Sequence, residues 1–432
     1  MTSLNEDIFD SKPEQAFLRW YHRVFSIKEI ENSVALKWVF GAAILSHFIA
    51  FNSWFGNKAT TVDAFNAGKY FCWPYFQSCG EFLFLRTLPE GYSQPFLYMV
   101  LFGTLLLAVY LMHKRDWVLA HLALMPSFIW HTLGTFVITG AFSGNYEYYL
   151  FILTFILLFL PHKEFFLKLV LVLFYFLAGS LKIHEGWVLG TYFSALKTGL
   201  PLFPDWSIPL WTNLVIFMEI VGAWFLFSKN WALQRLAIFF FVVFHLYSGL
   251  LVGFRYPVTV LPTLFILFGP FYQYTRVPLN KKAIAGWLLV AVLFPLQFIS
   301  NIIPGDEKLT LEGNKYGLYM FEANHQCISN VTVTGSDNVI NRSRKESESA
   351  RSRCDPYKYL LQIQQQCKVA EKLGASIEWT FDHSINGGPF LRIVDEKKVC
   401  ALEYKAFAHN EWIKTEKDSP EIIGYPVENQ YR

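Results

Sequence analysis

Long apolar stretches separated by short polar ones run through residues 34–303 of the chain. A bilayer crossing needs about 20 mainly apolar residues in one stretch. Nine stretches are predicted to form such helices: Ala35–Trp54, Pro95–Met112, Trp117–Ala141, Tyr146–Leu160, Phe165–Ile183, Pro209–Phe227, Leu236–Val252, Val258–Tyr272 and Ala283–Ile303. The pattern therefore predicts a polytopic α-helical membrane protein with about nine transmembrane helices.

The pattern changes at Pro304, where the chain becomes polar and the apolar residues occur in short alternating runs. Alternation is typical of half-buried strands, and it predicts strands at Thr332–Thr334, Ser376–Phe381 and Leu391–Val394. One helix is predicted at Lys358–Leu373. We therefore expect three parts: an amphipathic N-terminal segment (1–33), a transmembrane domain (34–303) and a small α+β domain (304–432).

Lysine and arginine in the short loops predict the orientation, because cytoplasmic loops are enriched in both. With a cytoplasmic N-terminus, the inside loops carry Lys114, Arg115, Lys163, Lys168, Lys229, Arg235, Arg276, Lys281 and Lys282. The C-terminal domain is then extracytoplasmic, periplasmic in a bacterial inner membrane or lumenal in the endoplasmic reticulum. The segment Phe17–Ile30 has the pattern of a helix lying in the cytoplasmic interface, and an ordinary amphipathic linker helix fits it equally well.

All six cysteines fall in segments that this orientation places outside: Cys72, Cys79, Cys327, Cys354, Cys367 and Cys400. An even number on the oxidising side favours disulfide bonds, although six cysteines allow about fifteen pairings. Cys72 and Cys79 are the expected local pair. The absence of a CxxC spacing argues against a zinc or redox motif.

Composition excludes two broad classes. With 53% hydrophobic and only 16% charged residues, the chain is too apolar for a soluble enzyme of this length. The net charge of +3 is small and its basic residues are spread over many loops, so nucleic acid is not an expected partner. The expected surroundings are lipid.

Five ionisable residues interrupt the apolar helices: His47, His131, Lys182, Glu219 and His245. Each costs about 2.5–3.5 kcal/mol at membrane depth, so each needs a physical reason. Lys182 is interpreted either as a desolvated base or as an amine that snorkels to the outer interface. Glu219 is interpreted either as the ion-pair partner of Lys182 or Arg255, or as a catalytic group. His245 is interpreted either as a packing residue or as a functional one.

The histidine spacing argues against a metal centre. A membrane di-iron site needs clusters such as HxxxH, and none of the eleven histidines supplies one, so no metal is expected. A haem with two histidine ligands among His47, His131 and His245 stays open.

Four motifs in order resemble the vitamin K-dependent γ-glutamyl carboxylase family over nearly the whole chain. The first is Ala178-Gly179 with Lys182, Trp187 and Gly190, and the second is Phe244-His245 with Tyr256-Pro257. The third is Thr310, Glu312-Gly313 and Tyr316, and the fourth is Phe381, Ser384, Asn386-Gly387 and Asp395. The chain is similar to a short, bacterial-type member with the HTTM membrane domain.

The resemblance implies a lyase that also epoxidises a quinone. It would couple oxygenation of a reduced naphthoquinone, of the vitamin K or menaquinone type, to γ-carboxylation of glutamate in a secreted peptide, with O₂ and CO₂ as co-substrates. Lys182 matches the family's base. The resemblance further implies that His245, Glu219, Tyr256, Arg255 and Trp187 surround the quinone.

The fourth predicted helix departs from the family at Glu147, where members commonly have a histidine tied to carboxylation. Glu147 is therefore a second catalytic candidate, and epoxidation without efficient carboxylation is one possible outcome. Two other functions stay open. One is a haem-bearing quinone oxidoreductase, and the other is a non-enzymatic maturation or immunity protein for a secreted peptide.

Overall fold

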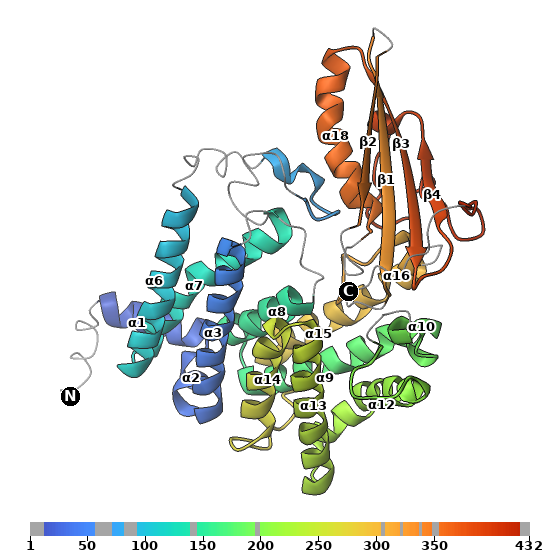
Figure 1. The fold of residues 1–432 in the computed structure, drawn as a ribbon. Helices are drawn as coiled ribbons and strands as arrows, with labels where there is room; N and C mark the ends of the chain where they lie inside the picture. The colour runs from blue at the N-terminus through green and yellow to red at the C-terminus, as the bar shows by residue number, and fades with distance from the viewer. Residues whose placement is uncertain are drawn as a thin grey trace, which may run out of the picture.

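The computed structural model describes residues 13–56, 71–81, 93–138, 145–194, 199–303, 307–319, 323–336, 339–347 and 354–423. Helices make up the described chain as far as residue 310, and a four-stranded sheet with one long helix follows. In Figure 1 this sheet and the helix α18 project together from one side of the helical part. The described chain thus consists of a helical part followed by a small C-terminal sheet domain, and the predicted boundary at Pro304 lies outside the described residues.

The helical part begins with α1 (Pro13–Val24), α2 (Ile27–Asn32), α3 (Val34–Gly56), the 3₁₀ helix η2 (Gln77–Glu81), α6 (Ser93–His113), α7 (Trp117–Leu133), the π-helical turn η3 (Gly134–Ile138), α8 (Asn145–Phe159) and α9 (Lys163–Leu181). It continues through α10 (Glu185–Val188), α11 (Thr191–Ser194), η4 (Asp205–Ser207), α12 (Ile208–Ile220), η5 (Gly222–Phe227), α13 (Trp231–Val252), α14 (Arg255–Phe268), η6 (Lys281–Ala283), α15 (Ile284–Gln297), α16 (Ile299–Ile302) and α17 (Glu307–Thr310).

Four of these helices, among the described residues, are long and apolar enough to cross a membrane. They are the spans Val34–Phe55, Pro95–His113, Lys163–Leu181 and Trp231–Leu251. A helix also lies within each of the other five predicted stretches, but these helices are shorter, and α7, α14 and α15 contain internal prolines. Proline removes a backbone donor and bends a helix. Nine complete spans are therefore not confirmed.

The four spans differ in how they are surrounded. Within its apolar window, α9 is 72% buried, whereas α6 and α13 are each only 22% buried. The exposed side chains of α6 and α13 are large and apolar, among them Leu106, Tyr110, Phe239 and Leu250. Such surfaces are stable against lipid and costly against water. The helix α9 therefore lies inside the bundle, with α8, α12, α14 and α15 packed around it.

The N-terminal helix α1 is attached by one side. Tyr21 is buried, and its hydroxyl lies 2.6 Å from His121 Nδ1 on α7. Phe17, Trp20 and Val24 remain exposed. This division leaves an apolar surface on α1, which suits the expected interfacial position.

The C-terminal sheet has the strand order β2-β1-β3-β4, and every neighbouring pair is antiparallel. Its strands are β1 (His325–Thr334), β2 (Ile340–Glu346), β3 (Ser376–Ile385) and β4 (Leu391–Glu396). The helix α18 (Pro356–Lys372) joins Trp379 and Phe381 of β3 in one apolar core. The three predicted strands and the predicted helix are confirmed, while β2 was not expected because its sequence INRSRKE has no apolar alternation.

Three disulfide bonds join the six cysteines. The expected local pair, Cys72–Cys79, is present. The bond Cys327–Cys354 ties β1 to the residues before α18, and Cys367–Cys400 ties α18 to the 3₁₀ helix η7 (Val399–Ala401). A small domain with a limited core gains most from such links because they restrict its unfolded chain.

Residues 307–319 connect the bundle to the sheet domain. The side chain of Gln297 makes two hydrogen bonds with the backbone of Leu318, at 2.8 and 2.7 Å. Trp73, beside the local disulfide, donates to the Lys315 carbonyl at 2.6 Å. Gly313 has φ +80°, and a Cβ there would lie 2.6 Å from Ser300 Cα, so glycine is required. The connection is therefore a packed interface.

Candidate functional site

Lys182 and Glu219 form a buried ion pair. Lys182 caps the C-terminal end of α9, Glu219 lies in the last turn of α12, and Nζ and Oε2 are 2.6 Å apart. Both side chains are only 1% exposed. Lys182 Nζ also donates to the Ala178 carbonyl at 3.0 Å. The expected pairing with Lys182 is confirmed, and the amine does not extend to solvent.

Gly179 explains how α9 and α12 come close enough for this pair. A Cβ at Gly179 would lie 2.7 Å from Ile220 Cγ1 and 2.9 Å from Glu219 Cβ. Both distances are below normal carbon contacts, so any side chain here would push α12 away. The glycine of the Ala178-Gly179 motif thus sets the geometry of the ion pair one turn later.

Trp187 lies beside the pair. The Lys182 amine is 5.2 Å from the centre of its ring, which is within cation–π range, and Tyr192 stacks on the ring at 5.6 Å. Trp187 is 8% exposed. Its Nε1 donor is buried and has no hydrogen-bond partner among the described residues. A buried N–H without a partner is costly, so this atom is a ready donor for a ligand oxygen.

His245 lies in a neighbouring group of aromatic side chains. Its Nε2 is 2.7 Å from the Tyr175 hydroxyl, and its ring centre is 5.0 Å from that of Tyr256. His245 is fully buried, and its Nδ1 has no hydrogen-bond partner in the described chain. Tyr175 was not expected as a site residue, because nothing in the sequence distinguishes it from the other aromatic residues of α9.

Glu147 belongs to a separate network. His131 Nε2 donates to Glu147 Oε2 at 2.7 Å, Trp54 donates to Oε1 at 3.3 Å, and Arg255 also donates to Oε1. The guanidinium of Arg255 lies 4.5 Å above the Tyr146 ring. Arg255 therefore pairs with Glu147 and not with Glu219. The two groups adjoin at the start of α14, where Arg255 faces Glu147 and the next residue, Tyr256, faces His245.

A metal centre and a haem were the two other chemistries considered from the sequence. No group of three or more histidine, cysteine or acidic residues there is arranged to hold a metal ion. The Nε2 atoms of the three haem candidates are engaged, by Thr154 for His47, by Glu147 for His131 and by Tyr175 for His245. The Nδ1 atom of each of these histidines has no hydrogen-bond partner among the described residues, so it is the ring nitrogen left for a ligand.

A cavity of about 140 Å³ lies at the C-terminal end of α9. Its lining comes from α9, from α15 and α16, and from the connecting segment, and includes Ser180, Ile183, Gln297, Ser300, Lys308 and Asn314. It is smaller than the roughly 300–1,000 Å³ of typical small-molecule sites. A bicyclic ligand would therefore need side chains to move.

The fourth motif of the sequence reaches this same region. Asn386 accepts a hydrogen bond from Asn324 N at 2.8 Å, and Asn324 Nδ2 donates to the Tyr192 carbonyl at 2.6 Å. A Cβ at Gly186 would lie 3.0 Å from Asn386 Nδ2. The end of β3 is thus packed against the two short helices that carry Trp187 and Tyr192.

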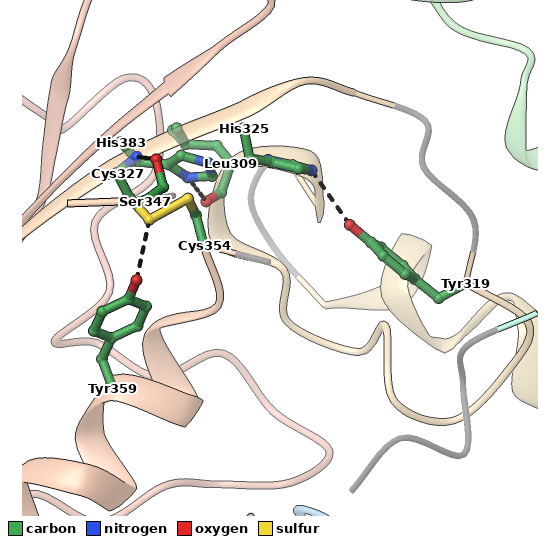
Figure 2. Close-up of a disulfide and its surroundings, with 8 residues drawn as sticks. All are labelled: Leu309, Tyr319, His325, Cys327, Ser347, Cys354, Tyr359 and His383. Carbon is green, nitrogen blue, oxygen red and sulfur yellow. Dashed lines mark hydrogen bonds between the residues drawn. A yellow bond between two sulfur atoms is a disulfide. The ribbon is translucent and has the colours of Figure 1, made fainter. Parts of the chain in front are cut away.

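A chain of hydrogen bonds crosses the base of the sheet (Figure 2). The Leu309 carbonyl can only accept, so His383 Nδ1 carries the hydrogen of the 2.7 Å contact between them. Burial lowers the pKa of His383 to about 4, so the ring is neutral at pH 7. Its Nε2 then accepts from His325 Nδ1 at 3.0 Å, and His325 Nε2 accepts from the Tyr319 hydroxyl at 3.3 Å.

Glu312 of the third motif fixes the other side of the connection. Its carboxylate accepts hydrogen bonds from His409 Nδ1, Asn410 N and Asn410 Nδ2, each at 2.8 Å. The side chain is 1% exposed. This motif residue therefore binds the connecting segment to the C-terminal residues His409 and Asn410.

Comparisons with protein-family models, with curated proteins and with solved structures found no match. The fold and the site by themselves define a class: a mainly helical protein with membrane-length helices, a buried lysine–glutamate pair and a disulfide-bonded sheet domain.

Proposed function

We propose that the chain is an integral membrane enzyme of the vitamin K-dependent γ-glutamyl carboxylase type. The observation that carries the proposal is the Lys182–Glu219 pair, buried at 2.6 Å beside Trp187 and within electrostatic reach of His245. A buried ion pair is a weak source of stability, since hydrophobic replacements often do as well. A chemical role explains better why it is present.

The donor set fits a naphthoquinone. Trp187 Nε1 and His245 Nδ1 are buried polar atoms without partners in the described chain. One quinone oxygen would accept a hydrogen bond from Trp187 Nε1. The other, as a hydroxyl in the reduced quinone, would donate to His245 Nδ1. When bound, the reduced quinone would supply the four electrons that reduce O₂, with one oxygen atom entering its epoxide and the other leaving as water, while CO₂ replaces the γ-proton of a peptide glutamate.

The ion pair suits the removal of a hydroxyl proton. Transfer of a proton from Lys182 Nζ to Glu219 Oε2 turns an ammonium–carboxylate pair into an amine–acid pair with no change in net charge. The free amine of Lys182 would accept a proton from a hydroxyl of a bound reduced quinone, and the positive charge restored on Nζ would offset the negative charge on that oxygen. Tyr175 and Tyr256 pack against His245, and Phe241 stacks on Tyr175, so this aromatic group would exclude water from the transfer.

We assign Glu147, with His131 and Arg255, to the carboxylation half of the reaction. The Arg255 side chain is 41% exposed, whereas that of Glu147 is 8% exposed, so the guanidinium is the open end of the network. A cation at an opening suits an anionic glutamyl substrate. The full arrangement further requires nine membrane crossings, a cytoplasmic N-terminus and an extracytoplasmic sheet domain that holds the peptide.

The test is Lys182→Ala, with quinone epoxide and carboxylated peptide assayed separately. Both products should fall by about 10²–10⁴-fold, the usual contribution of a general base. Lys168→Ala is the matched control, because Lys168 lies in the same helix, is 1% exposed and pairs with Glu164 at 2.7 Å. Glu147→Gln should reduce carboxylation more than epoxidation. Full retention of both activities in Lys182→Ala would disprove the mechanism.

A further inference from the structure

The strand β2 forms one edge of the sheet and pairs only with β1 within the described chain. All seven of its residues are exposed. It carries three basic residues, Arg342, Arg344 and Lys345, and one acidic residue, Glu346, which leaves a surplus of two positive charges. An exposed edge is a template for a further strand, and its charge selects which chains can join it.

The hydrogen bonds at its two ends show which residues turn their backbone outward. Next to β2, Gly335 N donates to Val339 O at one end and Ser347 N donates to Cys327 O at the other. In an antiparallel pair, hydrogen-bonded positions alternate with positions that face away. Residues 339, 341, 343, 345 and 347 therefore bond to β1, and Arg342 and Arg344 direct their N–H and C=O groups outward.

The same two arginines share a face. Ser343 is opposite Val331, which is opposite Trp379 in the core, so Arg342 and Arg344 project from the other side of the sheet. Lys345 projects toward α18, with its amine 5.7 Å from the Tyr359 ring. Two arginines separated by one residue lie about 7 Å apart, which is the spacing of alternate side chains in a neighbouring strand.

The position of β2 relates this edge to the helical part. Its C-terminal residue Glu346 is opposite Ile328, near the start of β1, and Asn324 just before β1 bonds to Tyr192. A chain lying parallel to β2 would therefore run toward the end of the sheet that packs against the short helices carrying Trp187.

We propose that β2 binds an extended acidic peptide as a fifth strand, with glutamates at alternate positions opposite Arg342 and Arg344. The identification of this peptide as the substrate rests on the proposed function, whereas its binding does not. A second copy of the chain fits the edge less well, because two β2 strands would bring like charges together.

The test measures binding of a labelled synthetic peptide to the full chain in lipid nanodiscs, without quinone. The probe alternates threonine and glutamate over about eight residues, and a second peptide of equal composition has its glutamates in adjacent pairs. Arg342→Thr/Arg344→Thr keeps strand propensity and should weaken the alternating peptide about two- to thirtyfold. Lys397→Ser/Lys417→Ser, which removes two exposed charges elsewhere in the domain, is the control and should change little.

Two single variants separate strand addition from simple attraction of charge. Arg342→Pro and Arg342→Thr lose the same charge, but only proline removes the outward N–H, so Arg342→Pro should bind the peptide more weakly. Glu346→Gln should bind it more tightly, because Glu346 accepts from Arg344 at 2.8 Å and competes with the peptide. Equal binding by the proline and threonine variants, or by the two peptides, would overturn the proposal.

The same protein samples separate this inference from the proposed function. Lys182→Ala should bind the alternating peptide normally while losing both products. A carboxylated product made equally well by Arg342→Thr/Arg344→Thr would overturn the role of the edge and leave the mechanism intact. Light scattering measures the oligomeric state of the same samples. If the unsubstituted chain were a dimer that does not bind the peptide, and Arg342→Pro were a monomer, the β2 edge would pair with a second copy of itself and the proposal would be overturned.

Discussion

At the scale of single residues, the bundle contains paired charges at both ends of α9. Lys168 bonds to Glu164 and to the Gln273 carbonyl, and Lys182 bonds to Glu219 and to the Ala178 carbonyl. Each lysine thus has one carboxylate and one carbonyl as acceptors. Charges removed from water are tolerated only with such partners, and losing one partner is more costly than losing both.

This asymmetry gives a stability prediction. Lys182→Met leaves the Glu219 carboxylate buried without its partner, so the free energy of unfolding should fall by about 3–5 kcal/mol. Lys182→Met/Glu219→Leu removes both charges and should recover most of that loss. Thermal unfolding in detergent measures the two variants. A double variant that is less stable than the single one would contradict the argument.

His383 gives a prediction about pH. Burial lowers its pKa to about 4, whereas an unfolded histidine has a pKa of about 6.5. Between these values the unfolded chain binds the proton and the folded chain does not. Stability is therefore complete above about pH 6.5 and falls by about 3 kcal/mol as the pH drops toward 4. Hydrogen exchange of the β1 and β3 amides should show this slope, and His383→Asn should flatten it.

At the scale of elements, the contact between α9 and α12 depends on one missing side chain. Gly179→Ala places a methyl group against Ile220 and Glu219, and should cost about 1–3 kcal/mol and lower the quinone reaction. Gly103→Ala in α6 is the matched control, since a Cβ there meets no atom within 4 Å. It should be neutral or slightly stabilising in thermal unfolding. Equal losses in both variants would show that the close contact between α9 and α12 does not decide the outcome.

The helices and strands show which parts of the structure could be predicted from the sequence. Apolar stretches located every major helix, because burial of apolar residues is a local property of the chain. The sequence also identified Lys182 and Glu219 as one possible pair, since an unpaired charge in an apolar helix is so costly. It could not identify β2, whose residues are all exposed, nor Tyr175, nor the pairing of four cysteines. Those depend on contacts between distant segments.

At the scale of the whole molecule, we predict that the sheet domain lies outside the membrane and the N-terminus in the cytoplasm. All six cysteines are in disulfide bonds, so an introduced cysteine is a unique free thiol. Lys417→Cys in the sheet domain should react with a charged maleimide added outside intact cells. Lys229→Cys, which is exposed in the loop before α13, should react only after the membrane is permeabilised. The opposite result would reverse the proposed topology.

The separation of the buried partners along the chain has a consequence for biosynthesis. Lys182 and Glu219 are 37 residues apart, and at about 5–20 residues per second the ribosome adds α12 roughly 2–7 seconds after α9 is complete. During that time the lysine has no carboxylate from α12. We therefore expect α9 to be held by the insertion machinery, or by water at the membrane surface, until α12 is made. The two helices would then enter the lipid as a unit.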